Sequence, residues 1–505
     1  MTRHVDVLII GAGLSGIGMA CHLTREQTGR SYAILERRTA IGGTWDLFRY
    51  PGIRSDSDML TFGFGFRPWI GTKVLADGPH IRQYIEDTAA EYGVTEHIRF
   101  GRKMTKAGWS SETELWTVEV LDEQTGETEI YTSNFLVGCT GYYDYDNGYR
   151  PQFPGEADFR GQIVHPQHWP DELDYRGKRV VVIGSGATAI TLVPAMADDT
   201  AHITMLQRSP TYIAALPADD PVAVGMRFAR VPKKIAYRTG RARNIALQRA
   251  SFRLSRTNPE LSKKLLLAAV RMQLGKEIDM GHFTPSYNPW DQRLCIVPNG
   301  DLFKVLRSGK ASIVTDHIDR FTESGIRLAS GKELPADIVI SATGLTVQIL
   351  GGATLEVDGE PVSTRKHVVY KGTLLDGIPN AMLVLGYTNA SWTLKADLAA
   401  EYFCRVLNHM KAHGYTKVVA IAEDADRSDQ SVMGSALTSG YIQRGDGVMP
   451  RQGTRGPWQV INNYFRDRVL LRKAPLEDGV LTFDGAAAAT RSGGKPKGPV
   501  RQRIA

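Results

Sequence analysis

Two glycine-rich turns carry the residue types and spacing in this 505-residue sequence that could do chemistry. In the first, Gly11, Gly13 and Gly16 form a GxGxxG pattern directly after the apolar run at 5–10. In a βαβ unit such glycines make a tight turn, let a pyrophosphate approach the backbone and allow close helix packing, while the helix N-terminus faces the phosphates. The next apolar run ends at Glu36, an acid that would bond ribose hydroxyls and repel a 2′-phosphate. This turn is therefore predicted to bind FAD or NAD and not NADP.

A second turn of the same kind lies at residues 184–189, after the strand predicted at 178–183. Ala189 takes the place of the third glycine, which the fingerprint allows. The strand that follows ends near Arg208, whose guanidinium could pair with a 2′-phosphate; the alternative is an arginine on an ordinary surface turn. The second turn is thus predicted to bind NADPH. Together the two sites suggest FAD and NADPH, with hydride passing from NADPH to the flavin.

The cysteines limit what could accept electrons from the flavin. All four are far apart and none forms a CxxC pair: Cys21, Cys139, Cys295 and Cys404. This pattern argues against a metal site, a redox-active disulfide and a disulfide framework, and it fits a reducing cytoplasm. Disulfide reductases also have two nucleotide-binding domains, but they need a dithiol. Molecular oxygen is therefore the natural acceptor.

A segment between the two turns, residues 159–170, packs aromatic rings, a glycine and two histidines into twelve residues. Pro166 and Pro170 forbid a regular helix through it. Two interpretations are open from the segment alone. It is a packed interdomain linker without chemistry, or it passes motion or contact from one nucleotide to the other.

The same segment resembles the fingerprint of type I Baeyer–Villiger monooxygenases, which are class B flavoprotein monooxygenases. Every fixed position of that fingerprint matches: Phe159, Gly161, His165, Trp169 and Pro170. A second family motif is matched by Gly42, Gly43, Trp45, Tyr50, Pro51, Gly52 and Asp56. The resemblance covers the chain to about residue 480 and is strongest to a mycobacterial branch that activates the thioamide prodrug ethionamide.

The resemblance implies a reaction. Reduced FAD reacts with O2 to give a C4a-peroxyflavin, which attacks a ketone so that the adduct rearranges to an ester or lactone; sulfides or thioamides would also be oxygenated. Two alternatives stay open. One is a flavin-containing N- or S-monooxygenase, whose similar fingerprint lacks the Trp169-Pro170 ending. The other is a nucleotide-binding flavoprotein that acts as a peripheral redox partner.

The resemblance also implies roles for individual residues. Arg293 matches the family's arginine beside the reacting oxygen, where a fixed cation stabilises negative charge, and Asp56 matches the acid that orients it. The residues expected near FAD are Gly11, Gly13, Ser15, Gly16, Glu36, Thr44, Trp45, Asp46, Leu47, Asp56 and Met104. Those expected near NADP are Arg54, Ser55, Ile183, Gly184, Ser185, Gly186, Ala187, Thr188, Ala189, Gln207 and Arg208. No metal ligand is expected.

One position departs from the family pattern. Gln292 stands where many members carry a lysine that helps to hold the NADP ribose phosphate. The preference for NADPH over NADH then depends mainly on Arg208.

The order of the strands, glycine turns and helices expected around these residues predicts an α/β fold. It has two Rossmann-like dinucleotide-binding domains, with the NADPH domain inserted in the FAD domain. We expect the first part of the FAD domain at 1–145, the NADPH domain at 146–340 and the second part of the FAD domain at 341–484. A helical insert is expected at about 215–280, and a flexible basic tail at 485–505.

Charge is concentrated in that insert. Residues 226–276 hold fourteen Lys or Arg and one acid, Glu260, while the whole chain has a net charge of only +7. The helices present either solvated faces or a patch for a peripheral membrane contact; a nucleic-acid partner is not expected, since no binding motif accompanies the charge. No apolar run reaches the length of a membrane span and no signal peptide is evident, so we expect a cytoplasmic protein, with membrane association and self-association left open.

Overall fold

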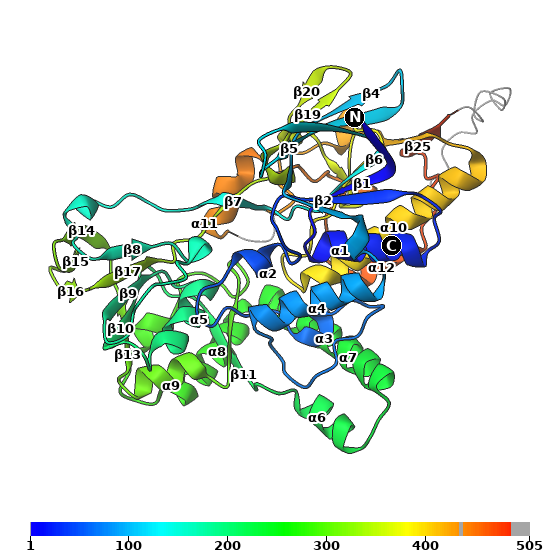
Figure 1. Cartoon of the computed structure of the whole chain (residues 1–505). Coiled ribbons are helices and arrows are strands. Elements are labelled where there is room, and N and C mark those ends of the chain that lie inside the picture. The colour runs from blue at the N-terminus through cyan, green and yellow to red at the C-terminus, as the bar shows by residue number, and fades with distance from the viewer. Residues whose placement is uncertain (1, 434–437, 486–505) are drawn as a thin grey trace.

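The chain folds around two sheets in a computed structural model that describes residues 2–433 and 438–485 (Figure 1). The first sheet has nine strands in the order β20-β19-β4-β5-β6-β1-β2-β3, with β23 also paired to β6. Their bounds are β1 Arg3–Ile10, β2 Tyr32–Glu36, β3 Ile98–Phe100, β4 Arg102–Ser110, β5 Leu115–Asp122, β6 Thr128–Gly138, β19 Thr354–Val357, β20 Glu360–Val362 and β23 Ala381–Leu383. The strands β2 and β6 flank β1 and run parallel to it, and β23 runs parallel to β6, as a dinucleotide-binding sheet requires.

The strand β1 is apolar without interruption because both of its faces are covered. Val7 and Ile9 belong to a core shared with α1 (Leu14–Arg25), α4 (Gly78–Glu91) and α10 (Trp392–His413). Leu8 and Ile10 face the opposite way, into a core with Trp109 and other residues of β4 and β5. The end of β1, where the first glycine turn begins, is therefore held rigidly from both sides.

The second sheet has five parallel strands in the order β13-β10-β9-β17-β8. Their bounds are β8 Gln162–Val164, β9 Arg179–Ile183, β10 His202–Gln207, β13 Ala311–Thr315 and β17 Ile338–Ser341. One face packs on α5 (Ala187–Met196) and α9 (Asp301–Arg307). The other face is covered by an antiparallel sheet of β14 (Ile318–Thr322), β15 (Gly325–Leu328) and β16 (Glu333–Pro335).

All strands of the second sheet lie in the chain between β6 and β19 of the first, so the predicted α/β fold with one dinucleotide-binding module inserted in the other is confirmed. The two connections pair with each other. The strand β7 (Tyr143–Gly148) runs antiparallel to β18 (Leu345–Val347), and β7 bridges the space between the two sheets in Figure 1.

The insert is helical, as expected, and consists of α6 (Pro221–Phe228), α7 (Lys233–Thr257) and α8 (Pro259–Leu274). Sequence signals at their starts explain the boundaries. Asp220 accepts hydrogen bonds from the first free N–H groups of α6, and Asn258 does the same for α8. Flanking this insert are β11 (Ile213–Leu216) and β12 (Cys295–Pro298), which pair in parallel.

The glycine- and tryptophan-containing stretch at 42–56 has no regular period in sequence, yet it contains the one-turn helix α2 (Thr44–Leu47). It is followed by α3 (Met59–Phe62), while α11 (Gly440–Arg444), α12 (Tyr464–Arg472) and the β24–β25 pair (Lys417–Ala420 and Leu481–Asp484) complete the C-terminal part. The predicted tail lies outside the described residues, apart from Gly485. No helix within the described ranges has both the length and the apolar character to cross a membrane.

Candidate functional site

The first glycine turn leaves no room for side chains. Gly11 has a φ of +102°, and a Cβ there would lie 2.8 Å from the carbonyl oxygen of Cys139. A Cβ on Gly16 would lie 1.9 Å from the carbonyl oxygen of Gly11, so α1 packs directly against the turn. On its other side the turn lines a cavity through Gly11, Gly13 and Ser15, and bare backbone at the start of α1 is the arrangement that suits a pyrophosphate.

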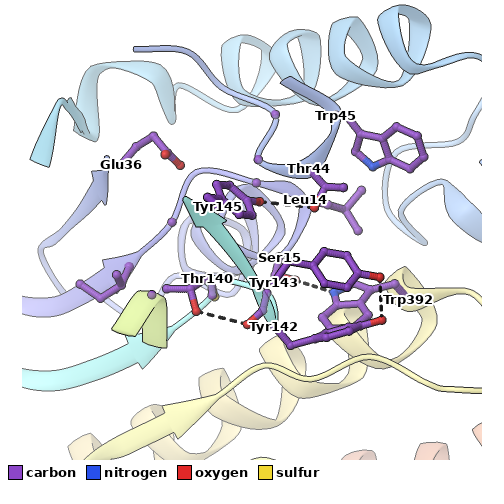
Figure 2. A pocket seen from close by; sticks show the side chains of 18 of the residues that line it. Leu14, Ser15, Glu36, Thr44, Trp45, Thr140, Tyr142, Tyr143, Tyr145 and Trp392 are labelled. Carbon is purple, nitrogen blue, oxygen red and sulfur yellow. Dashed lines mark hydrogen bonds between the residues drawn. The ribbon is translucent and has the colours of Figure 1, made fainter. Parts of the chain in front are cut away.

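A cavity opens at this turn. Its wall includes these residues predicted to lie near FAD: Gly11, Gly13, Ser15, Glu36, Thr44, Trp45, Asp56 and Met104. Ser55, which was assigned to NADP, and Arg293 line it as well. Figure 2 shows Glu36, Ser15, Thr44 and Trp45 around this space.

Glu36 closes one end of the cavity. One carboxylate oxygen accepts the N–H of Ala12 at 2.7 Å, and the other accepts the N–H of Arg38 at 2.9 Å. Burial raises the pKa of this carboxyl group, against the effect of those two hydrogen bonds. The side chain is thus held in one orientation beside the turn, where it suits a diol and excludes a phosphate.

Aromatic side chains form a wall that sequence reasoning missed. The indole N–H of Trp392 donates to Oγ of Ser15 at 2.8 Å, and its ring stacks on Tyr142 with centroids 5.4 Å apart. The hydroxyl groups of Tyr142 and Tyr143 are 3.0 Å apart, and that of Tyr145 lies 3.3 Å from Oγ1 of Thr44 (Figure 2). The available signal was position, because the three tyrosines lie shortly after the carboxyl end of β6 and at the start of β7, and α/β sheets bind ligands at the carboxyl ends of their strands.

Arg293 and Asp56 meet at the cavity although 237 positions separate them in the chain. Nη1 of Arg293 donates to Oδ2 of Asp56 at 3.0 Å, and Nε is buried without a hydrogen-bond partner in the described residues. Its side chain is 33% exposed. Burial alone would lower the pKa of Arg293, but Tyr441, Tyr142 and Asp56 raise it well above its usual value. The site therefore holds a permanent cation.

Three residues expected near FAD lie outside the cavity wall: Gly16, which packs against the backbone of Gly11, and the neighbours Asp46 and Leu47. The Asp46 carboxylate is buried and is paired with three arginines, Arg38, Arg49 and Arg82. Leu47 packs in the core of the second sheet. The side chains of Asp46 and Leu47 hold the loop at 42–56 between the two sheets, and only their backbone remains available to a ligand.

The second glycine turn is built on the same plan but is more open. Gly184 has a φ of +136°, and a Cβ there would lie 2.4 Å from the carbonyl oxygen of Ala342. A Cβ on Gly186 would meet no atom within 4 Å, which leaves the space before Ala187, the first residue of α5, free. Oγ of Ser185 donates to the carbonyl oxygen of Ser209 at 3.0 Å, which ties the turn to the loop after β10.

The other residues assigned to NADP divide into two groups. Arg208 is exposed, and no ion pair or side-chain hydrogen bond engages it within residues 2–433 and 438–485. Gln207, by contrast, is buried and donates to the carbonyl oxygen of His282 at 2.7 Å and to Oγ1 of Thr315 at 2.8 Å. Ile183 and Ala189 are also core residues, so these three can reach a nucleotide through their backbone alone. Thr188, at the start of α5, lies near the hydroxyl of Tyr50.

Arg54 lies between the two modules. Nη1 donates to Oδ2 of Asp301 at 2.6 Å, while Nη2 is buried without a partner in the described residues. An unsatisfied guanidinium N–H is costly unless a ligand takes it, so this atom fits a phosphate or carboxamide group. Oγ of Ser55 is already engaged with the backbone of Ser57.

The segment at 159–170 ties the connecting strands to the second sheet. The N–H of Gln167 donates to Nδ1 of His165, so the other ring nitrogen carries the proton and donates to the carbonyl oxygen of Gly344 at 3.2 Å. Burial lowers the pKa of His165, which keeps the ring neutral. Trp169 packs on the core of the second sheet. The segment is therefore a packed linker whose histidine holds the loop that follows β17.

Sequence comparison places the chain among known proteins. Residues 74–444 match a family described as flavin-binding monooxygenase-like, and residues 9–86 match a family described as an NAD(P)-binding Rossmann-like domain. The chain is 56% identical over 493 residues to the putative FAD-containing monooxygenase MymA of Mycobacterium tuberculosis, covering 96% of this chain and 99% of that protein. It is 51% identical over 485 residues to the FAD-containing monooxygenase EthA of the same species, covering 96% and 98%.

Comparison of structures identifies the fold. An open crystal structure of cyclohexanone monooxygenase superposes with a TM-score of 0.76 over 96% of this chain and all of that one, at 19% sequence identity. The arrangement of the two glycine turns and the connecting strands is thus that of a known monooxygenase fold.

Proposed function

The chain belongs to the flavin-binding monooxygenase family and is an FAD-dependent monooxygenase, and from this premise we propose that it consumes NADPH and inserts one oxygen of O2 beside a ketone carbonyl, giving an ester or lactone. Oxygenation of sulfides or thioamides is included in the proposal. The contact between Arg293 and Asp56 at the wall of the cavity is the observation that carries it.

The residues of the first module suit the flavin. The glycine turn would hold the pyrophosphate, Glu36 the ribose hydroxyls, and the wall of Trp392 and Tyr142 would exclude water from the reacting end. When bound, FAD and NADPH supply the reduction of O2 on which oxygenation depends.

Arg293 supports the Baeyer–Villiger assignment over N- or S-oxygenation. Attack on a ketone carbonyl places negative charge on the substrate oxygen, and a fixed guanidinium stabilises that charge without reorganising. Asp56 keeps the guanidinium oriented toward the cavity. A sulfide or amine attacks the oxygen with its own lone pair, and no such oxyanion forms on the substrate. Its oxygenation therefore has less need for a fixed guanidinium such as that of Arg293.

The experiment is to incubate the FAD-loaded protein with NADPH, O2 and a panel of ketones and sulfides. Esters or lactones support the proposal, sulfoxides without esters favour the N- or S-monooxygenase, and hydrogen peroxide alone favours the redox partner. We expect Arg293→Ala to lower ester formation by about 100- to 1,000-fold while reduction of the flavin by NADPH continues. Ester yield at the wild-type level in this variant would show that Arg293 is not needed for ester formation.

We also propose the remaining site assignments and the domain boundaries. The division at 145/146 and 340/341 agrees with the pairing of β7 and β18, since both connections cross there. Arg208 and Arg54 are proposed as the charged contacts to NADP, supported by the exposed guanidinium of one and the unsatisfied Nη2 of the other.

We propose a cytoplasmic enzyme that works against a membrane surface. The buried thiols of the four cysteines suit a reducing compartment, and the insert α6–α8 supplies the surface. Self-association of the chain stays a prediction, which light scattering after size-exclusion chromatography would test.

A further inference from the structure

The exposed large apolar side chains of the described residues are concentrated on the insert α6–α8. Eight of the fourteen exposed large apolar side chains in the described residues lie on these three helices. Phe228 is 91% exposed and Met272 is 78% exposed. The eight are Val222, Val224, Phe228, Ile235, Leu247, Leu261, Leu265 and Met272. Such a concentration indicates a contact with something outside the chain.

On α8 the exposed apolar side chains form one stripe. Leu261, Leu265 and Met272 are separated by four and seven residues, and at about 100° per residue they share one face of the helix. The buried residues of α8, which include Val270 and Leu274, hold it to the second sheet. The helix thus has an apolar side packed inward and a second apolar stripe turned to solvent.

The same helices carry cations without counter-ions. Of the fourteen Lys and Arg between 226 and 276, three form ion pairs: Arg241 with Asp397, Arg243 with Asp220 and Arg256 with Asp291. The other eleven make none within the described residues: Arg227, Arg230, Lys233, Lys234, Arg238, Arg249, Arg253, Lys263, Lys264, Arg271 and Lys276. Interleaved cations and exposed apolar side chains are the features that hold a helix in the headgroup region of an anionic bilayer.

The inner side of the insert is fixed to the wall of the site. The hydroxyl of Tyr237 on α7 donates to the carbonyl oxygen of Phe64 at 3.0 Å, and Gly240 lies against Leu60 of α3. Ile245 packs with Tyr387, which lines the cavity. In Figure 1, α6 and the end of α7 project away from both sheets. A surface that holds the outer side of these helices would therefore lie close to the substrate cavity.

We propose that α6–α8 dock the enzyme on an anionic phospholipid bilayer, with Phe228 and the stripe of Leu261, Leu265 and Met272 inserted among the lipids and the unpaired cations on the phosphates. This names the partner of the membrane contact proposed above and is independent of the oxygenation chemistry. Charge favours the bilayer over a second copy of this chain, because an isologous contact would bring two cationic surfaces together. Apolar substrates dissolved in the bilayer would then be concentrated beside the cavity.

The test is co-sedimentation of the FAD-loaded protein with vesicles of phosphatidylcholine alone or mixed with phosphatidylglycerol. We expect binding to the mixed vesicles that weakens as salt is raised, and little binding to phosphatidylcholine. Lys263→Glu with Lys264→Glu, and separately Leu265→Glu with Met272→Glu, should each weaken binding by about tenfold or more. The matched controls are Lys332→Glu and Val469→Glu, at exposed positions outside the insert, which should bind as the wild type does.

Oxygenation measured without vesicles separates the two proposals. All four variants should oxidise NADPH with substrate at the wild-type rate, since none of these residues lines the cavity. Vesicle binding without oxygenation in the wild type would overturn the proposed function alone. Absence of binding to mixed vesicles at low salt, binding unchanged in the insert variants, or a stable dimer that the Leu265 and Met272 changes dissociate would each overturn the membrane surface.

Discussion

Gly11 and Gly184 occupy equivalent places in the two sheets. The N–H of each donates to the neighbouring strand, Gly11 to Leu35 at 2.7 Å and Gly184 to Leu206 at 2.8 Å. Each also lies under a carbonyl oxygen, that of Cys139 or Ala342, which a Cβ would strike. The two glycine turns thus make the same backbone contacts with their sheets.

The two modules differ in what surrounds this shared turn. In the first, α1 approaches so closely that Gly16 admits no Cβ, and the acid Glu36 is buried with both oxygens engaged. In the second, Ala189 fits in the core, and the arginine Arg208 is exposed and unengaged within the described residues. The first turn is therefore the more enclosed of the two, and the second is the more open.

The largest expected effect is at the closest contact. Gly16→Ala would place a Cβ 1.9 Å from the carbonyl oxygen of Gly11, so α1 must move away from β1. We expect loss of bound FAD and a destabilisation of about 1–3 kcal/mol, as for overpacked cores. Flavin absorbance and the thermal unfolding midpoint measure the two effects. Gly186→Ala is the matched control, because its Cβ meets no protein atom, and it should keep FAD and weaken only NADPH binding.

The next effect tests the exposed charge of the second module. Arg208→Ala should raise KM for NADPH by about 10- to 100-fold and leave KM for NADH unchanged. The reason is that a hydrogen bond to a charged group contributes about 1.5–3 kcal/mol, and only NADPH carries the 2′-phosphate. Steady-state kinetics with both donors measure it, with Arg208→Lys as the variant that retains the charge. Equal changes for NADPH and NADH would assign the 2′-phosphate contact to another residue.

A smaller effect is expected at the buried acid of the first module. Glu36→Gln keeps the size of the side chain but replaces one acceptor oxygen with a donor, so the N–H of Ala12 or of Arg38 loses its partner. We expect the free energy of FAD binding to become less favourable and the free energy of unfolding to fall, each by about 1–3 kcal/mol. Titration of the apoprotein with FAD measures the affinity, and an unchanged Kd would mean that Glu36 does not contact the ribose.

The smallest effect concerns the link between the modules. The folded-state pKa of His165 is lowered by burial, so the unfolded chain binds this proton more tightly. Stability from His165 is therefore fully present above its ordinary pKa of about 6.5 and is lost as pH falls toward the folded value. Unfolding followed from pH 8 to 5 should show this loss in the wild type and a reduced loss in His165→Ala. That variant should also use more NADPH per ester formed while it keeps FAD, and an unchanged ratio would leave the histidine with packing alone.

Most of the shared turn could be predicted from sequence because it depends on short-range geometry. The spacing of Gly11, Gly13 and Gly16 and the acid at Glu36 form a local pattern, and the two sheets followed from apolar runs that end at such turns. Side-chain direction could not be predicted in the same way. Gln207 neighbours Arg208 in the chain, yet its amide turns into the core toward His282 and Thr315. On a strand, neighbouring residues point to opposite sides, and only packing decides which side is buried.

The sequence by itself determined the two dinucleotide modules, their opposite charges and the family resemblance, because each depends on residues close together in the chain. The tertiary structure alone decided the reacting end of the site. Arg293 reaches Asp56 only because the insert returns the chain to the first module, and Trp392 reaches Ser15 only because α10 packs beside α1. Contacts between such distant positions follow from how sheets and helices bury their apolar faces, which no local pattern contains.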